Sequence, residues 1–172
     1  MWFGKIHNII STKSYLKKYV KHLKNLGVNI YGFPNYISPD AYFDSHFYSS
    51  ISIGKGVVIS KQVLLLTHDY SIARGIEAVK GKHWEKEGKI IGGVPHFVGD
   101  IFIDSNTFIG ARAMILPNTH IGKNCIIGAG AVVKGIVPDD SIVVGNPGKI
   151  IANTRDWTEK HIEKKDFINC QF

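Results

Sequence analysis

Residues 97–138 read in groups of six as FVGDIF, IDSNTF, IGARAM, ILPNTH, IGKNCI, IGAGAV and VKGIVP. The first position of every group is a large apolar residue, from Phe97 to Val133, and the fifth is mostly small or β-branched, as at Thr107 and Ala113. A period of six matches neither the 3.6-residue period of an amphipathic helix nor the alternation of an isolated strand. It indicates a short strand followed by a turn, repeated along the chain.

Strands this short bury an apolar face only when successive coils stack on one another. A second run with the same pattern has Ile53, Ile59 and Leu65 at its first positions. Ile37 and Phe43 continue the pattern upstream, but they are out of register with Ile53. The sequence therefore predicts one stacked repeat over residues 37–151, with a slip in register near residue 47.

The repeat stops between Thr67 and Phe97, and His68 stands where the chain leaves the coil. A long irregular excursion from a compact fold is usually functional or disordered. Histidine is the side chain best suited to accept a proton near neutral pH. From the residues alone, His68 is either a loop histidine without a chemical role or a general base.

Three stretches carry a resemblance to a known family: SISIGKGVVISKQVLLLTHDYS, IGARAMILPNTHIGKNCIIGAGAVV and VPDDSIVVGNPGKII. The chain resembles the hexapeptide-repeat acyltransferases, which include galactoside, maltose, serine and nodulation-factor acetyltransferases and polysaccharide O-acetyltransferases. The resemblance implies an all-β fold, a left-handed parallel β-helix with three hexads to a coil, over residues 37–151, with a loop insertion at 69–96. It also implies acetyl-CoA as co-substrate and a homotrimer.

The resemblance further implies that His68 is the general base, which activates an acceptor hydroxyl for direct attack on the thioester of acetyl-CoA. Such a base works better when a carboxylate fixes its tautomer. Asp44 and the adjacent Asp69 are the candidates on the acceptor side, and each is equally explained as a turn aspartate. Tyr70 and Trp84 are candidates for stacking on a sugar, or for packing the loop against the body.

On the donor side, the resemblance assigns Gly110 and Ala111 to the neighbourhood of the thioester carbonyl, where a backbone N–H stabilises the developing charge. Small residues such as Ala111 and Ala129 allow the pantetheine arm to approach the backbone closely. Lys134 and Lys149 are candidates for contacts with the CoA phosphates. The family usually has Thr-Lys where this chain has Lys134-Gly135, so Lys134 is displaced by one position.

No group of His, Cys and carboxylates has the spacing of metal ligands, so no metal is expected. A γ-carbonic-anhydrase-like enzyme shares the repeat but needs three metal-binding histidines. The spacing of His68, His96 and His120 does not favour that alternative. His96 is instead expected to approach His68 from the far end of the loop.

The chain has 172 residues and a formal net charge of +7. Six lysines and no acidic residue lie before residue 40, and the rest of the chain is nearly neutral, so nucleic acid is not expected as a partner. Residues 12–26 have the period of an amphipathic helix, with Ser11 or Thr12 as its cap. Within an N-terminal cap segment, 1–36, this helix is expected to pack on the open end of the repeat, with contact to an anionic membrane as the less favoured alternative.

The tail, 152–172, predicts a further short helix from Trp157. No run of about 18 apolar residues and no signal-peptide pattern is present, so the expected location is cytoplasmic. The predicted function is acetyl-CoA-dependent O-acetylation of a sugar hydroxyl in surface-polysaccharide or O-antigen assembly. Alternatives are N-acetylation of an amino sugar, acetylation of serine or of an antibiotic, and, from a different class, a non-catalytic β-helix scaffold.

Overall fold

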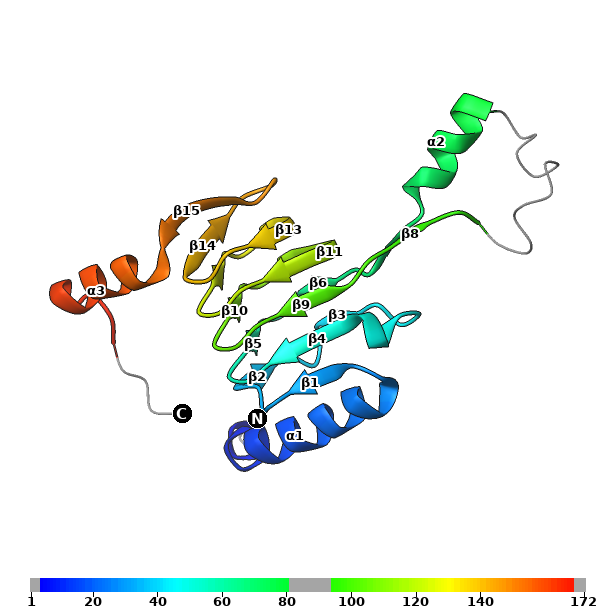
Figure 1. Cartoon of the computed structure of the whole chain (residues 1–172). Helices are drawn as coiled ribbons and strands as arrows, with labels where there is room; N and C mark the ends of the chain where they lie inside the picture. Colours follow the sequence, from blue (N-terminus) through cyan, green and yellow to red (C-terminus); the bar gives the residue numbers. More distant parts are fainter. Residues whose placement is uncertain (1–3, 81–93, 169–172) are drawn as a thin grey trace.

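The protein forms a left-handed parallel β-helix with a helix at each end and a long arm on one side (Figure 1). The computed structural model describes residues 4–80 and 94–168. Parallel strands stack into three faces, because each coil pairs only with the coils above and below it. The hexapeptide pattern therefore predicts the fold correctly.

The first face lies next to the arm. It consists of β3 (Tyr42–Phe43), β6 (Leu64–Leu65) and the first parts of β11 (Met114–Ile121) and β13 (Val132–Val137). The third face contains β1 (Asn29–Tyr31), β4 (Ile51–Gly54), β9 (Ile101–Ile103) and the later parts of β11 and β13. Because β11 and β13 continue around the corner, these two faces form one seven-stranded sheet.

The second face is a separate six-stranded sheet. It contains β2 (Tyr36–Ile37), β5 (Val58–Ile59), β10 (Phe108–Ile109), β12 (Ile126–Ile127), β14 (Ser141–Val144) and, antiparallel to β14, β15 (Lys149–Asn153).

The core is the inside of the coils. The apolar side chains at the first hexad position are almost completely buried, except Phe97, which lies on β8 of the arm and is 53% exposed. They include Ile53, Ile59, Leu65, Ile103, Ile109, Ile115, Ile121 and Ile127. The small side chains at the fifth position are buried beside the turns, as at Thr107 and Ala113. Both parts of the hexad pattern thus point inward, as the sequence predicts.

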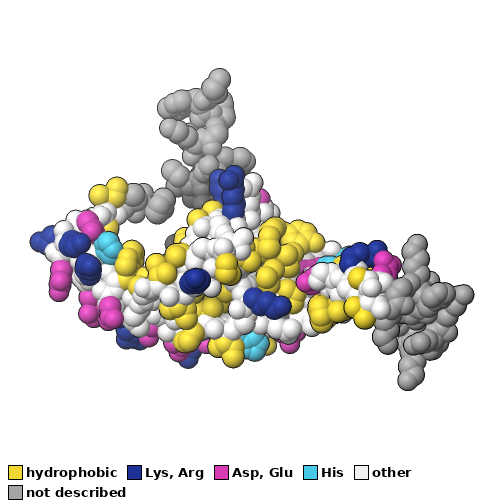
Figure 2. Space-filling model, turned by 90° about the horizontal axis from the view of Figure 1, so that it is seen from above, with side chains coloured by type: hydrophobic (Ala, Val, Ile, Leu, Met, Phe, Trp, Pro, Cys, Tyr) yellow, Lys and Arg dark blue, Asp and Glu magenta, His cyan; other side chains and the backbone are white. Residues whose placement is uncertain are grey.

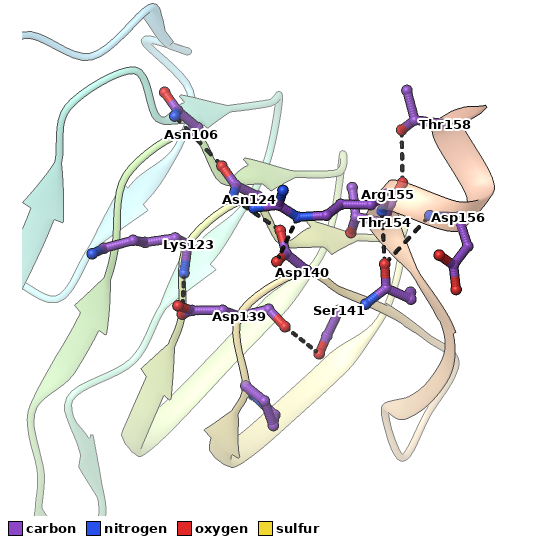
Figure 3. Close-up of polar contacts among 12 residues, drawn as sticks. Asn106, Lys123, Asn124, Asp139, Asp140, Ser141, Thr154, Arg155, Asp156 and Thr158 are labelled. Carbon is purple, nitrogen blue, oxygen red and sulfur yellow. Dashed lines mark hydrogen bonds and ion pairs between the residues drawn. The ribbon is translucent and has the colours of Figure 1, made fainter. Parts of the chain in front are cut away.

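One corner of the β-helix is built from a ladder of polar side chains (Figure 3). Asn106, Asn124 and Asp140 all have a positive φ, between 55° and 58°, which Asn and Asp tolerate better than other residues. The Asn124 amide donates to Asp140 at 2.9 Å, and the Asn106 amide lies 3.5 Å from Asn124. Arg155 Nε donates to Asp140 at 2.9 Å and so ties the C-terminal helix to this corner.

Helix α1 (Gly4–Leu26) closes one end of the β-helix and is longer than the expected 12–26. No glycine or proline interrupts the sequence after Gly4, so the helix continues through the expected cap at Ser11. Leu16, Val20 and Leu23 are buried in the core, which leaves this stripe unavailable to a membrane surface. Among the described residues, no helix is long and apolar enough to cross a membrane.

At the other end, α3 (Thr154–Lys164) begins before the expected Trp157. Asn153 caps it, because its side-chain oxygen accepts hydrogen bonds from the backbone N–H groups of Arg155 and Asp156. Lys165 ends the helix in the left-handed conformation.

The arm leaves the body through an antiparallel pair, β7 (His68–Asp69) and β8 (Phe97–Val98). The sequence predicts an irregular excursion here, but the structure contains a helix, α2 (Ser71–Lys80), that projects away from the β-helix (Figure 1). The predicted slip in register is a short 3-10 turn, η1 (Tyr48–Ser50), inserted at the corner between β3 and β4.

Candidate active site

His68 lies at the corner where the chain leaves the first face of the β-helix. Leu65 is fixed in the core by pairing with Ile115, and the backbone N–H of Leu66 donates to Ile115 O. Thr67 is fully buried, so the turn that carries His68 is anchored from below. The His68 side chain itself is 19% exposed and can therefore meet a substrate.

Asp44 is the partner of His68. It follows β3, one coil below, and is completely buried. Its Oδ2 accepts hydrogen bonds from the backbone N–H of Thr67 at 3.0 Å, from the Thr67 hydroxyl at 2.9 Å and from His68 Nδ1. Because no part of Asp44 is exposed, it sits behind His68 rather than on the surface that a substrate meets.

These contacts fix both the charge and the tautomer of the pair. Burial works to raise the pKa of Asp44, but the hydrogen bonds from Thr67 and His68 outweigh it and leave that pKa below its ordinary value. Asp44 Oδ2 accepts a hydrogen bond from the N–H at His68 Nδ1, which favours the tautomer whose Nε2 is free to accept a proton. The geometry thus prepares His68 to act as a base.

Asp69, the other candidate, does not contact the imidazole in this way. Its Oδ1 accepts the backbone N–H of Ser71 at 2.8 Å, which starts α2. This hydrogen bond, together with the Ser71 hydroxyl and, more weakly, Lys134 and His68, lowers the pKa of Asp69. Of the two candidate aspartates, Asp44 is therefore the partner of His68, and Asp69 is a turn aspartate.

Aromatic rings surround His68. Tyr70 meets it edge-on, with ring centroids 4.9 Å apart, and His96 lies 6.3 Å away across the β7–β8 pair. His96 does approach His68 from the far end of the arm, as the sequence predicts. His46 and Phe47, each 5.9 Å from His68, were not predicted. Both lie next to the break in the hexad register near residue 47, and this break is the sequence signal that could have identified them.

A cavity of about 470 Å³ opens beside His68, at the corner where the coils turn from the first face to the third. Its apolar wall consists of Leu66, Phe97, Leu116 and Pro117. Its polar groups are His68, Asp69, Asn118 and Lys134. Lys134 therefore lies at the His68 end of the site, in the same cavity as the proposed base.

The predicted donor residues lie elsewhere in the chain. Gly110 and Ala111 follow β10 on the second face, Ala129 is one coil further along, and Lys149 starts β15. The backbone N–H of Gly110 donates to Ile127 O at 2.7 Å and is therefore occupied within the stack. Trp84 lies outside the described residues.

Among the residues that the structure describes, no group of three His, Cys, Asp or Glu side chains is placed to hold a metal ion. His120 lies on β11 beside Phe102 of β9, on the third face.

Comparison with known proteins identifies the repeat. A family model described as "Bacterial transferase hexapeptide (six repeats)" matches residues 100–135. Residues 100–135 therefore carry the hexapeptide repeat that this family model describes. The hexapeptide-repeat chain is 31% identical, over 117 residues, to the putative acetyltransferase YvoF of Bacillus subtilis (strain 168), covering 68% of this chain and 56% of YvoF. It is 24% identical over 102 residues to the putative lipopolysaccharide biosynthesis O-acetyl transferase WbbJ of Escherichia coli (strain K12), covering 59% of this chain and 50% of WbbJ.

Solved structures show the same fold. The hexapeptide-repeat containing acetyltransferase VCA0836 of Vibrio cholerae O1 biovar eltor, solved with acetyl coenzyme A, superposes with a TM-score of 0.56 at 18% identity. The match covers 89% of this chain and 91% of VCA0836. The hexapeptide-repeat chain spans only about half the length of YvoF and of WbbJ.

Proposed function

We propose that this protein is an acetyl-CoA-dependent O-acetyltransferase that acetylates a sugar hydroxyl. The observation that carries the proposal is the contact between buried Asp44 and His68 Nδ1, at the edge of an open cavity. A carboxylate that fixes a partly exposed imidazole is the arrangement required of a general base in acyl transfer. A non-catalytic scaffold has no need of a buried charge at this corner.

The acetyl group moves directly from CoA to the acceptor, by addition of the hydroxyl to the thioester and collapse of the tetrahedral intermediate. His68 Nε2 accepts the proton of the acceptor hydroxyl while that oxygen attacks the thioester carbon, whose carbonyl electrons move to oxygen. Collapse of this tetrahedral intermediate reforms the carbonyl and breaks the bond to sulfur. The CoA thiolate then takes the proton from His68, and Asp44 stabilises the imidazolium between the two transfers. No covalent acyl-enzyme is formed.

A sugar acceptor, in surface-polysaccharide or O-antigen assembly, fits the surroundings of the base. Tyr70 is 46% exposed and lies against His68 and His96, so part of this aromatic cluster is open to a sugar ring beside the base. The relative WbbJ is named as a putative lipopolysaccharide biosynthesis O-acetyl transferase. Trp84 remains a proposed second stacking residue, and Asp69 a hydrogen-bond acceptor for sugar hydroxyls.

For the donor, acetyl-CoA is proposed because the reaction needs an activated acetyl group and VCA0836, with the same fold, was solved with it. Gly110, Ala111 and Ala129 are the proposed surface for the pantetheine arm, where small side chains permit close approach. Lys149, which is exposed, is the proposed contact to the CoA phosphates.

The proposed assembly is a cytoplasmic homotrimer. Apolar side chains cover much of the face between α2 and α3, with few charges among them (Figure 2). Exposed apolar residues on the last strands include Ile136, Ile150 and Ile151, which are 83%, 55% and 62% exposed. An exposed apolar surface of this kind is a common mark of a subunit interface. Sedimentation equilibrium of the full chain tests the assembly.

A CoA-release assay with wild-type enzyme and acetyl-CoA tests the function. The panel consists of neutral hexoses, amino sugars, uronic acids and serine, and the product is identified by mass spectrometry and mild alkaline treatment, which cleaves an O-ester but not an N-acetyl amide. The proposal expects an alkali-labile acetyl ester on a sugar. Alkali-stable product on an amino sugar favours N-acetylation, and no CoA release with any acceptor contradicts the proposal.

A further inference from the structure

Lys134 stands inside the His68 cavity rather than at a distant phosphate site. It belongs to β13, and the pairing of Val133 with Ile115 and of Ile115 with Leu65 stacks Lys134 above Leu66, two residues before His68. Lys134 is exposed and is the one lysine or arginine among the described residues that line this cavity. It forms no ion pair with any described residue.

We propose that Lys134 is a catalytic residue that stabilises the oxyanion of the tetrahedral intermediate. This inference rests on the acetyltransferase function proposed above. His68 defines where the thioester carbon must lie, because the hydroxyl that it activates attacks that carbon. A cation in the same cavity therefore meets the reacting end of acetyl-CoA, whereas the phosphates lie at the opposite end of the extended pantetheine arm.

The charge of the intermediate needs such a donor. The Gly110 N–H already donates to Ile127 O, and neither Gly110 nor Ala111, which follow β10 on the second face, lines the His68 cavity. The Lys134 ammonium has three N–H donors and no partner that consumes its charge. Leu66, Phe97 and Leu116 give the cavity an apolar wall, against which an ammonium–oxyanion attraction is stronger than in open water.

Asp69 lines the same cavity, and its carboxylate is fixed at the start of α2, where its Oδ1 accepts the Ser71 N–H. In the step itself no atom is transferred to Lys134. The carbonyl electrons move to oxygen, the ammonium pairs with that O⁻, and the pair separates when the carbonyl reforms and the thiolate leaves.

The test compares Lys134→Met with Lys134→Arg, and uses Lys123→Met as a matched control on an exposed lysine away from the cavity. We expect Lys134→Met to lower kcat about 10²-fold, the size seen when one oxyanion donor is removed, with little change in the KM for acetyl-CoA. Lys134→Arg should recover part of that loss, and Lys123→Met should behave as wild type. The fall should be the same for every accepted acceptor and for the slow hydrolysis of acetyl-CoA by water.

Three results would overturn the inference. A fall confined to acceptors that carry a carboxylate would make Lys134 a residue for acceptor recognition. A rise in the KM for acetyl-CoA with unchanged kcat, absent when dephospho-CoA thioester is the donor, would return Lys134 to a phosphate contact. Wild-type kinetics in Lys134→Met would remove it from the site. Failure of the underlying function is distinguishable, because the wild-type enzyme would then release no CoA in the same assay.

Discussion

Replacing Asp44 by Asn tests the pair on which the proposed mechanism depends. Asp44 Oδ2 collects three donors, from the Thr67 N–H, the Thr67 hydroxyl and His68 Nδ1, while the buried Oδ1 accepts no hydrogen bond from a described residue. In the variant, the amide oxygen can keep the three donors only by placing the amide NH₂ at the Oδ1 position, without an acceptor. The opposite orientation faces the NH₂ toward the same three donors.

The size of the effect follows from these contacts. A buried NH₂ without a partner costs about 1–3 kcal/mol of folding stability, which for a chain of this length lowers Tm by roughly 2–12 °C. The loss of charge removes the stabilisation of the His68 imidazolium. We expect kcat/KM to fall about 10²–10³-fold, between the effect of an outer-shell partner and that of a triad carboxylate, or about 3–4 kcal/mol.

The assay is CoA release at saturating acetyl-CoA, together with thermal unfolding at several pH values. The folded-state pKa of Asp44 is lowered, so its contribution to stability is complete above the ordinary carboxyl pKa of about 3.9 and is lost as the pH falls through the folded-state value. The stability difference between wild type and Asp44→Asn should therefore shrink in acid. Asp100→Asn, on an exposed carboxylate, is the control. A well-folded Asp44→Asn enzyme with wild-type kcat/KM would show that His68 does not depend on the Asp44 carboxylate.

Three further predictions concern the scaffold. Gly110→Ala should lower the free energy of unfolding by about 2–4 kcal/mol in chemical denaturation, because its Cβ would lie 2.6 Å from Ala129 N, whereas Gly75→Ala, in open space on α2, should stabilise by up to about 1 kcal/mol; equal effects would contradict this packing. Ile109→Ala should cost about 2–5 kcal/mol in the same measurement, and a cost below 1 kcal/mol would mean that the coil interior is not close-packed. Changing four lysines to Gln, among those of α1 whose exposure the structure describes, should weaken salt-dependent retention on a heparin column without altering acetyl transfer; these lysines are Lys17, Lys18, Lys21 and Lys24. Unchanged retention would locate the charge-driven binding elsewhere.

The hexads could be read from the sequence because the β-helix is built from local units. Each coil contacts only its neighbours, so a period in the sequence is directly a period in space. The partner of His68 could not be read in the same way. The insertion containing η1 adds residues at one corner, and only the folded chain shows that Asp44, rather than Asp69, reaches His68 Nδ1.

The position of Lys134 relative to His68 could not be predicted from the sequence either. Its position near the end of the repeat suggests the phosphate end of a long ligand. Stacking of the coils brings it to the same corner as Leu66, so a separation of many residues along the chain becomes a few coils in space. Helix α2 follows directly on the turn at Asp69, whose Oδ1 accepts the Ser71 N–H, and the break in the hexad pattern does not distinguish such a helix from an irregular loop.

The most direct test of the account is the turnover of His68→Ala with the best acceptor from the panel, measured beside the binding of acetyl-CoA by calorimetry. His120→Ala, on another face, is the matched control. We expect His68→Ala to bind acetyl-CoA as wild type does but to lose at least about 10²-fold in kcat, while His120→Ala keeps its activity. Full turnover by His68→Ala on every accepted acceptor would contradict the central claim that His68, held by Asp44, is the base.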